Sequence, residues 1–215
     1  MTFIKFCRRI FNIIFKCKKI CYYENESRRG NVMEKFFKKK EKKGIFDAKE
    51  FACYIKAQYF DYTKGTKEIT PIKMQKALYF CFAYWAGFVN KGRIDNQLPT
   101  AENNLLFDDR FEAWAYGPVV PAVYFNEKDA MLFRTKEMEQ EAVQKVEVIL
   151  DSNPFLKETI DSLLHDLFEI SDFKLVSLSH MDKSWQNHFD SYASKHNEEI
   201  PHEDIINEYT TKKFD

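Results

Sequence analysis

The sequence predicts a mainly α fold: a compact helical domain around one central apolar helix, with a small β-strand or hairpin and a basic N-terminal extension. Three observations support this prediction. Residues 71–90 are apolar on almost every side of a helix, later segments repeat apolar residues at helical spacing, and the 215-residue chain has only 6 glycines. Scarce glycine and long helical periodicity favour helices over an all-β fold.

Charge separates a basic leader and linker, residues 1–44, from the predicted helical domain, residues 45–215. Residues 1–43 hold 14 of the 33 Lys and Arg but only 4 of the 33 Asp and Glu, a net charge of +10, so the rest of the chain carries −10. An acidic body repels the phosphate backbone, so we expect no specific nucleic acid among the partners.

Residues 1–23 place apolar and basic side chains on opposite faces of a helical wheel. A helix of this kind binds a membrane surface or a partner protein. Charges interrupt it too often for a transmembrane span. Two other interpretations stay open: a poorly ordered segment upstream of a true start at Met33, and a helix packed on the body. The interaction hypothesis depends on Phe3, Ile10 and Ile14 on one face and Arg8, Arg9, Lys16 and Lys19 on the other.

The body begins near Phe46, where Asp47 can cap a first helix and Glu50 completes a capping-box-like pair. Gly65 marks the turn into the next helix. The inward residues expected in the first helix are Phe51, Tyr54, Ile55 and Tyr59.

The central helix has clear start signals, because Thr70 is a good N-cap and Pro71 suits the first helical position. A helix that is apolar almost all round must be covered on most sides. We expect it to end near Gly92. Its stripe at steps of four and three residues consists of Met74, Leu78, Cys81, Trp85 and Phe88.

Aromatic and polar residues alternate over Phe111–Tyr116, which predicts a short half-buried strand. We expect Gly117 and Pro118 to break this strand, and Pro118 to start a short helix that runs through Tyr124. Trp114 is expected to pack on the central helix, whereas Tyr116 is left open between the core and the surface.

Helical spacing and helix-start signals predict five more helices, at residues 137–150, 154–170, 174–180, 185–193 and 200–209. In the first of these, Met138, Ala142, Val146 and Ile149 are expected to face inward. In the last, Ile205 and Tyr209 are expected to do so.

Three sequence blocks share a pattern with a known family. The matching residues are Thr70, Lys73, Gln75, Lys76, Leu78 and Tyr79, then Phe111, Ala113, Trp114, Tyr116, Gly117, Pro118, Val119, Pro121, Val123 and Tyr124, then Leu175, Ser179, His180 and Trp185. Over roughly residues 46–209 the chain resembles the Panacea domain, the SocA-like antitoxin family that includes phage-associated proteins. It departs from the family pattern in the third block, where Ser179 replaces a usual Thr and Ser184 a usual Pro.

The resemblance implies an antitoxin of a type II toxin–antitoxin system, a cytoplasmic protein that neutralises a cognate toxin by direct protein–protein binding. It implies no enzyme and no cofactor. Two alternatives stay open: a phage or mobile-element adaptor protein, and an uncharacterised enzyme. The motif residues that become candidates for interaction are Lys73, Gln75, Lys76, Tyr79, Trp114, Tyr116, Gly117, Pro118, His180 and Trp185.

Residue chemistry alone gives only weak catalytic candidates. Asp108, Asp109 and Glu112 lie close in sequence, and paired carboxylates do acid–base work when burial separates their pKa values, but acids in a connector are usually solvated. His180 and His188 with Asp182 lack any metal-site spacing, so we expect no metal. We expect the five cysteines to be reduced thiols.

Overall fold

The structure, a computed structural model, describes residues 44–95, 105–127, 132–190 and 197–212, all within one compact unit, Lys43–Lys213. The leader helix expected at residues 1–23 lies outside the described residues, together with its seven candidate residues. It stays a prediction, as does the division of the chain at residue 45.

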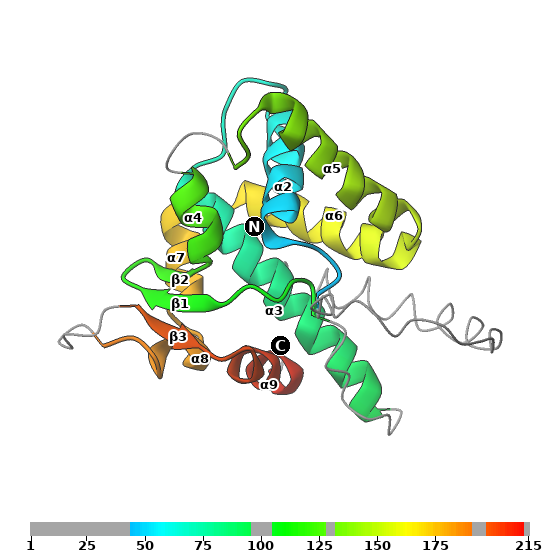
Figure 1. Cartoon of the computed structure of the whole chain (residues 1–215). Coiled ribbons are helices and arrows are strands. Elements are labelled where there is room, and N and C mark those ends of the chain that lie inside the picture. The colour runs from blue at the N-terminus through cyan, green and yellow to red at the C-terminus, as the bar shows by residue number, and fades with distance from the viewer. Residues whose placement is uncertain (1–43, 96–104, 128–131, 191–196, 213–215) are drawn as a thin grey trace, which may run out of the picture. The chain divides into compact units, whose positions relative to one another are not determined.

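Within the described residues the fold is mainly helical, with eight helices and one three-stranded antiparallel sheet (Figure 1). This confirms the predicted fold class. The elements are, in order, α2 (Ala48–Tyr62), α3 (Pro71–Asp95), β1 (Phe111–Trp114), β2 (Gly117–Val119), α4 (Pro121–Glu127), α5 (Lys136–Asp151), α6 (Pro154–Glu169), α7 (Asp172–Ser179), α8 (Lys183–Gln186), β3 (Glu198–Ile200) and α9 (His202–Thr211).

Helix α3 is the core of the domain, as predicted. Thr70 caps it, because its Oγ1 accepts a hydrogen bond from the Lys73 backbone N–H at 3.1 Å. Every residue from Lys73 to Gly87 is buried. The expected stop at Gly92 is wrong, since α3 continues to Asp95. A glycine inside a helix costs only about 1 kcal/mol, which does not by itself end the helix.

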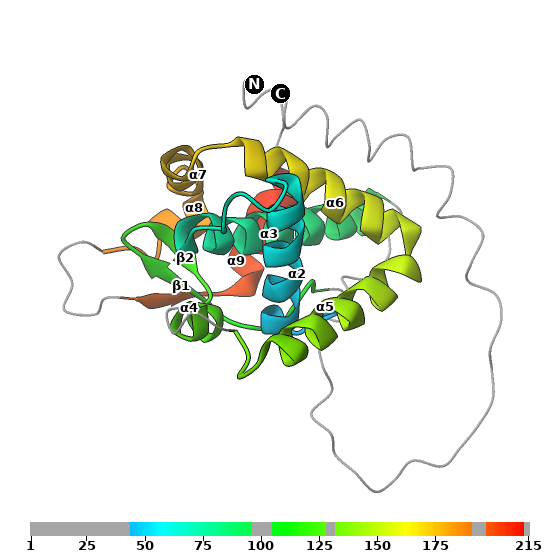
Figure 2. The same cartoon turned by 90° about the horizontal axis from the view of Figure 1, so that it is seen from above.

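Other elements cover α3 on several sides. It contacts α2, α4, α6, α7, α9 and β2. Figure 2 shows α2 crossing α3, with α5 and α6 beside α2 and the sheet near the end where α3 begins. Asp47 caps α2 as predicted, accepting from the Lys49 and Glu50 backbone N–H groups. The first part of α3, the sheet and α7 thus meet in one region.

The predicted strand at Phe111–Tyr116 is confirmed as β1, which is followed by a tight turn. The helix expected from Pro118 is wrong, because Gly117–Val119 forms β2 and pairs antiparallel with β1, with Trp114 opposite Gly117. Gly117 has a φ of 93°, which lets the chain reverse directly after Tyr116. The helix starts later, as α4.

Strand β3 completes the sheet in the order β2-β1-β3, and no sequence pattern predicted it. It has three residues, two of them exposed glutamates, which is too short to show an alternation. Helix α9 begins two residues later than expected, and its predicted inward residues Ile205 and Tyr209 are buried.

The remaining helices follow the predictions with two corrections. In α5, Ala142 and Val146 are buried as predicted, but Met138 is exposed, and it is the adjacent Glu139 that contacts α2 through Lys56. The helix predicted at 185–193 is only the four-residue α8. The chain leaves the helix after Gln186, and the ring of Phe189 stacks on Trp185 with centroids 4.5 Å apart.

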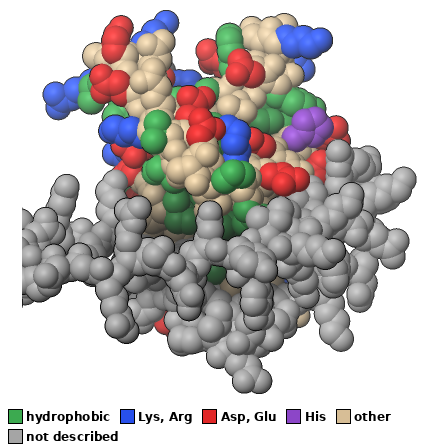
Figure 3. All heavy atoms as spheres, turned by 90° about the vertical axis from the view of Figure 1, so that its right-hand side faces the viewer, with side chains coloured by type: hydrophobic (Ala, Val, Ile, Leu, Met, Phe, Trp, Pro, Cys, Tyr) green, Lys and Arg blue, Asp and Glu red, His purple; other side chains and the backbone are tan. Residues whose placement is uncertain are grey.

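The surface seen from the right-hand side of Figure 1 intersperses acidic and basic side chains with scattered apolar ones (Figure 3). Among the described residues, no helix has the length and apolar character needed to cross a membrane. Two cysteines, Cys53 and Cys81, are buried as free thiols, and burial raises the pKa of Cys53 to about 12. Such thiols behave as small apolar groups.

Candidate functional site

A groove with a volume of about 700 Å³ lies where the beginning of α3 meets the hairpin, α4 and the segment after α8. Most of its lining is apolar, and its size is typical of a binding pocket. Residues of the first two sequence blocks line the groove directly. The third block reaches it through Phe189, whose ring stacks on Trp185 of that block. The lining residues are Pro71, Ile72, Gln75, Lys76, Ala113, Trp114, Ala115, Tyr116, Val119, Tyr124, His188, Phe189, Asp190 and Asn197.

Two side chains of α3 form the floor beside β2. Gln75 Oε1 accepts from the Val120 backbone N–H at 2.8 Å, and Lys76 Nζ donates to the Pro118 carbonyl oxygen at 2.7 Å. These bonds pair backbone groups along and just after the outer edge of β2, which a neighbouring strand would otherwise pair. They explain physically why the first block and the Gly-Pro-Val block occur together.

Gly117 brings its backbone against these side chains. A Cβ at this position would lie 2.3 Å from Ser179 Oγ and 2.8 Å from Lys76 Nζ. Only glycine fits, because its positive φ and the missing Cβ are both needed. Ser179 is fully buried and donates to the Val176 carbonyl oxygen at 2.9 Å, so it is not an open nucleophile.

Lys76 is a buried amine, and no ion pair of it is found in the described part of the chain. Burial alone lowers its pKa to about 7, because desolvation penalises the ammonium form. A lysine of this kind is a recognised signal of a functional site, and structural lysines share it. Lys76 is 1% exposed, and its Nζ already donates to the Pro118 carbonyl, so the amine is engaged within the fold.

Lys73 joins the start of α3 to the α6–α7 junction. Its Nζ donates to the carbonyl oxygens of Phe168 and Ile170 and forms an ion pair with Asp172 at 3.5 Å. A cation at the C-terminal end of α6 is favoured by the helix dipole. Lys73 is buried, so in this conformation it contacts the chain's own backbone.

The third block forms a stack of three rings. The ring centroids of His180 and Trp185 lie 4.0 Å apart. The ring of Phe189 also stacks on Trp185, with centroids 4.5 Å apart. Trp185 Nε1 also donates to the Trp114 carbonyl oxygen at 3.1 Å. The stack therefore fixes the end of β1 and positions Phe189 in the groove wall.

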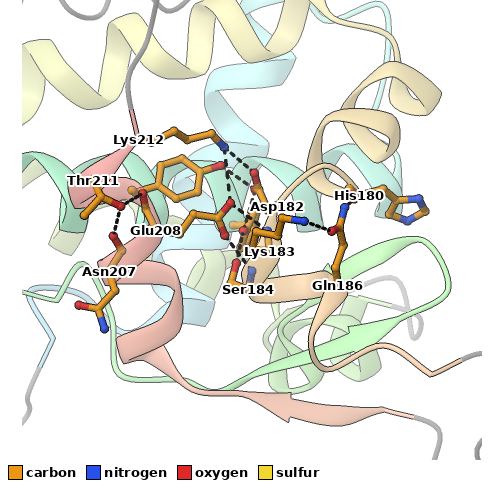
Figure 4. Close-up of polar contacts among 11 residues, drawn as sticks. His180, Asp182, Lys183, Ser184, Gln186, Asn207, Glu208, Thr211 and Lys212 are labelled. Atoms are coloured by element: carbon orange, nitrogen blue, oxygen red, sulfur yellow. Dashed lines mark hydrogen bonds and ion pairs between the residues drawn. The ribbon is translucent and has the colours of Figure 1, made fainter.

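Tyr79, one helical turn after Gln75 and Lys76 on α3, belongs to a separate buried polar cluster. Tyr79 and Tyr209 both donate to Asp182 Oδ2, at 2.8 and 2.7 Å, and Lys212 Nζ contacts Asp182 Oδ1 at 2.5 Å (Figure 4). Burial raises the pKa of Asp182 above its usual range even beside Lys212. The cluster ties α9 to α3 and to the start of α8, and it lies outside the groove lining.

Aromatic side chains form the rim of the groove at the hairpin. Trp114 is half-buried, and its ring meets Tyr124 of α4 edge-on with centroids 4.8 Å apart, whereas we expected packing on the central helix. Phe111 packs on Tyr79 and Phe82 of α3, and because side chains alternate along a strand, Trp114 lies on the other face of β1, where it meets α4. Tyr116, which the sequence left open, is 59% exposed.

The acidic candidates do not converge. Asp108 is exposed, burial raises the pKa of Asp109, and Glu112 is held by Arg110 at 2.8 Å and by Trp114 Nε1 at 2.9 Å. His188 instead lies 2.8 Å from Asp204 through Nε2. No group of three His, Cys, Asp or Glu in the described ranges has the arrangement of a metal site.

The groove thus joins the blocks on which the family resemblance rests. Residues 94–186 match the family model of the antitoxin SocA-like Panacea domain. No curated protein and no solved structure matches the chain.

The Panacea match confirms the resemblance over a shorter range than the expected 46–209. It contains the hairpin block and the block around Trp185, while the block at residues 70–79 lies N-terminal to it. That block is nevertheless integral to the site, because Gln75 and Lys76 hold the backbone of β2, which belongs to the matched range. The groove therefore combines residues from the Panacea range with residues outside it.

Proposed function

We propose that this protein is the antitoxin of a type II toxin–antitoxin system, which neutralises a cognate toxin by binding it without turnover. The observation that carries the proposal is the match of residues 94–186 to the SocA-like antitoxin model. The groove with its aromatic rim supports a role in binding. We also propose that it acts in the cytoplasm, where translation takes place and where toxins that block translation act.

The charge of the body supports a basic partner. The chain after residue 43 carries a net charge of −10, which attracts a basic toxin surface and speeds the encounter. The lining of the groove supports binding over catalysis, since its lysine is enclosed and Asp190 is the one carboxylate among its described lining residues.

Co-expression with the product of the neighbouring reading frame tests the proposal. We expect that product alone to stop growth, growth to return when this chain is co-expressed, and the two proteins to purify as a stable complex. A strain carrying this chain with an early stop codon is the control. If the chain neither restores growth nor forms a complex, the antitoxin proposal is wrong. A stable complex with a harmless product would instead support an adaptor protein.

A further inference from the structure

The groove beside the hairpin contains an unused hydrogen-bond donor. Gln75 is 3% exposed and lines the groove. Its Oε1 accepts from Val120 N–H, which fixes the orientation of the amide. Its Nε2 has no hydrogen-bond partner among the described residues. A buried donor left unpaired destabilises the fold, so an acceptor supplied from outside would bind here with a gain.

The walls around this donor favour an apolar occupant. Ile72 and Val119 line the groove near Gln75, and Phe189 and Trp114 add aromatic surface. Tyr116 stands at the rim and is 59% exposed, although large apolar side chains are usually covered. Phe125 on α4 is 57% exposed as well, and its ring centroid lies 6.0 Å from that of Trp114. Exposed aromatic rims of this kind are typical of protein interfaces.

Charge restricts which acceptor enters. The body of the chain carries −10, and the exposed Asp190 lies in the groove lining, whereas Lys76 in the same lining is enclosed and bonded to Pro118, so a carboxylate would be repelled. A neutral main-chain carbonyl supplies the acceptor without this cost. A basic partner protein, which the acidic body attracts, offers such a carbonyl next to an apolar side chain.

We propose that the groove binds an apolar side chain of the toxin, and that the main-chain carbonyl beside it accepts a hydrogen bond from Gln75 Nε2. This inference depends on the proposed antitoxin function and identifies where the toxin docks. Tyr116 and Phe125 enclose the bound segment at the rim, and Phe189 forms the opposite wall.

Binding measurements with the full-length chain and the purified neighbouring gene product test this proposal. Tyr116→Ala removes the exposed rim, and Ala115→Trp fills the groove from an exposed turn position, so neither change disturbs the core. We expect each to raise the Kd at least tenfold. Phe173→Ala is the matched control, because Phe173 on α7 is 72% exposed and does not line the groove. It should leave the Kd within twofold.

Gln75→Glu tests the hydrogen bond itself. The new carboxylate can still accept the hydrogen bond from Val120 N–H, but it has no N–H group in the place of Nε2. We therefore expect at least a tenfold rise in Kd. A thermal melt close to that of the original chain shows that this variant folds. Alanine substitution along the toxin should then locate one apolar residue whose loss matches the effect of Tyr116→Ala.

The outcomes separate the two proposals. If the unmodified chain does not bind the gene product, the proposed function itself is wrong. If it binds but Tyr116→Ala and Ala115→Trp have no effect, or Phe173→Ala weakens binding equally, the docking site is wrong while the function stands. A dimer of this chain that Tyr116→Ala converts to a monomer would assign the groove to a second copy and overturn the inference.

Discussion

Lys76 illustrates how a side chain of a charged residue type can serve as a buried hydrogen-bond donor to the backbone. Its amine is enclosed by α3, the hairpin and Ser179, and it donates to the Pro118 carbonyl oxygen. Burial lowers the pKa of Lys76 to about 7, so in a fraction of the molecules the amine is neutral at physiological pH. This reduces the free-energy cost of burying it. Lys76 is a structural part of the groove, and its lowered pKa reflects the burial of its amine.

The lowered pKa of Lys76 predicts a pH-dependent stability. The unfolded chain, with the ordinary pKa of 10.5, binds the proton more tightly than the fold does. The free energy of unfolding should therefore rise with pH between about 7 and 10, by about 1 kcal/mol per pH unit. Lys76→Met should lack this rise. Urea denaturation of both proteins at pH 7, 8, 9 and 10 measures it.

The difference between the two proteins is the informative quantity. Buried phenols and thiols such as Tyr79 and Cys81 have raised pKa values and lower the stability at high pH, but they are common to both chains. If the two stability curves run parallel, Lys76 does not have the lowered pKa in the folded protein.

Gly117 gives a second prediction at this scale. Gly117→Ala should lower the free energy of unfolding by about 3 kcal/mol, because a methyl group would clash with Ser179 and the φ of 93° would be strained. Gly65→Ala is the control, since Gly65 also has a positive φ but its nearest heavy atom is the flexible Phe60 ring at 3.1 Å. It should cost about 1 kcal/mol. Equal losses in urea denaturation would show that the Ser179 contact is unimportant.

At the scale of elements, α9 packs against α3. Gly87 lets α9 approach, because a Cβ there would lie 2.6 Å from Tyr209 Cβ and 2.7 Å from its backbone. The hydrogen bonds of Tyr79, Tyr209 and Lys212 to Asp182 then fix the position of α9. A small residue and a buried polar cluster thus work together to hold the last helix.

Gly87→Ala distinguishes local preference from packing. Helix propensity alone predicts a gain of about 1 kcal/mol, since alanine is the better helix former. The contact with α9 predicts a loss of about 1–3 kcal/mol instead. Denaturant melts give the sign, and a more stable variant would show that α9 does not pack on Gly87.

At the scale of the whole molecule, charge is distributed unevenly along the chain. The first 43 residues carry +10 and the rest −10. The acidic part suits a basic partner protein, while the basic part suits anionic lipid or an acidic surface. The two parts therefore predict different partners for the two ends of one chain.

Vesicle flotation tests the role of the leader. Each basic residue near an anionic bilayer contributes about 1 kcal/mol, so we expect the full-length chain to float with vesicles that contain phosphatidylserine. A chain that starts at Met33 lacks the candidate helix and should stay in the bottom fraction. Neutral phosphatidylcholine vesicles are the control. Equal flotation of both chains would remove the membrane hypothesis.

Local sequence signals were sufficient to predict the elements that depend on near neighbours. The cap at Thr70, the buried stripe of α3 and the strand at Phe111 follow from spacing and capping, because these signals act within a few turns of chain. The same blocks also carried the family resemblance, which the match over residues 94–186 confirmed.

How distant residues combine became visible only in the folded chain. Gly117–Val119 became a strand because Gln75 and Lys76, about 40 positions earlier, satisfy its outer edge. Strand β3 exists because β1 offers it a partner, not because its own residues favour a strand. The groove likewise appears only when α3, the hairpin and Phe189 meet. Sequence spacing carries no information on such pairings, since their energy comes from contacts between segments far apart in the chain.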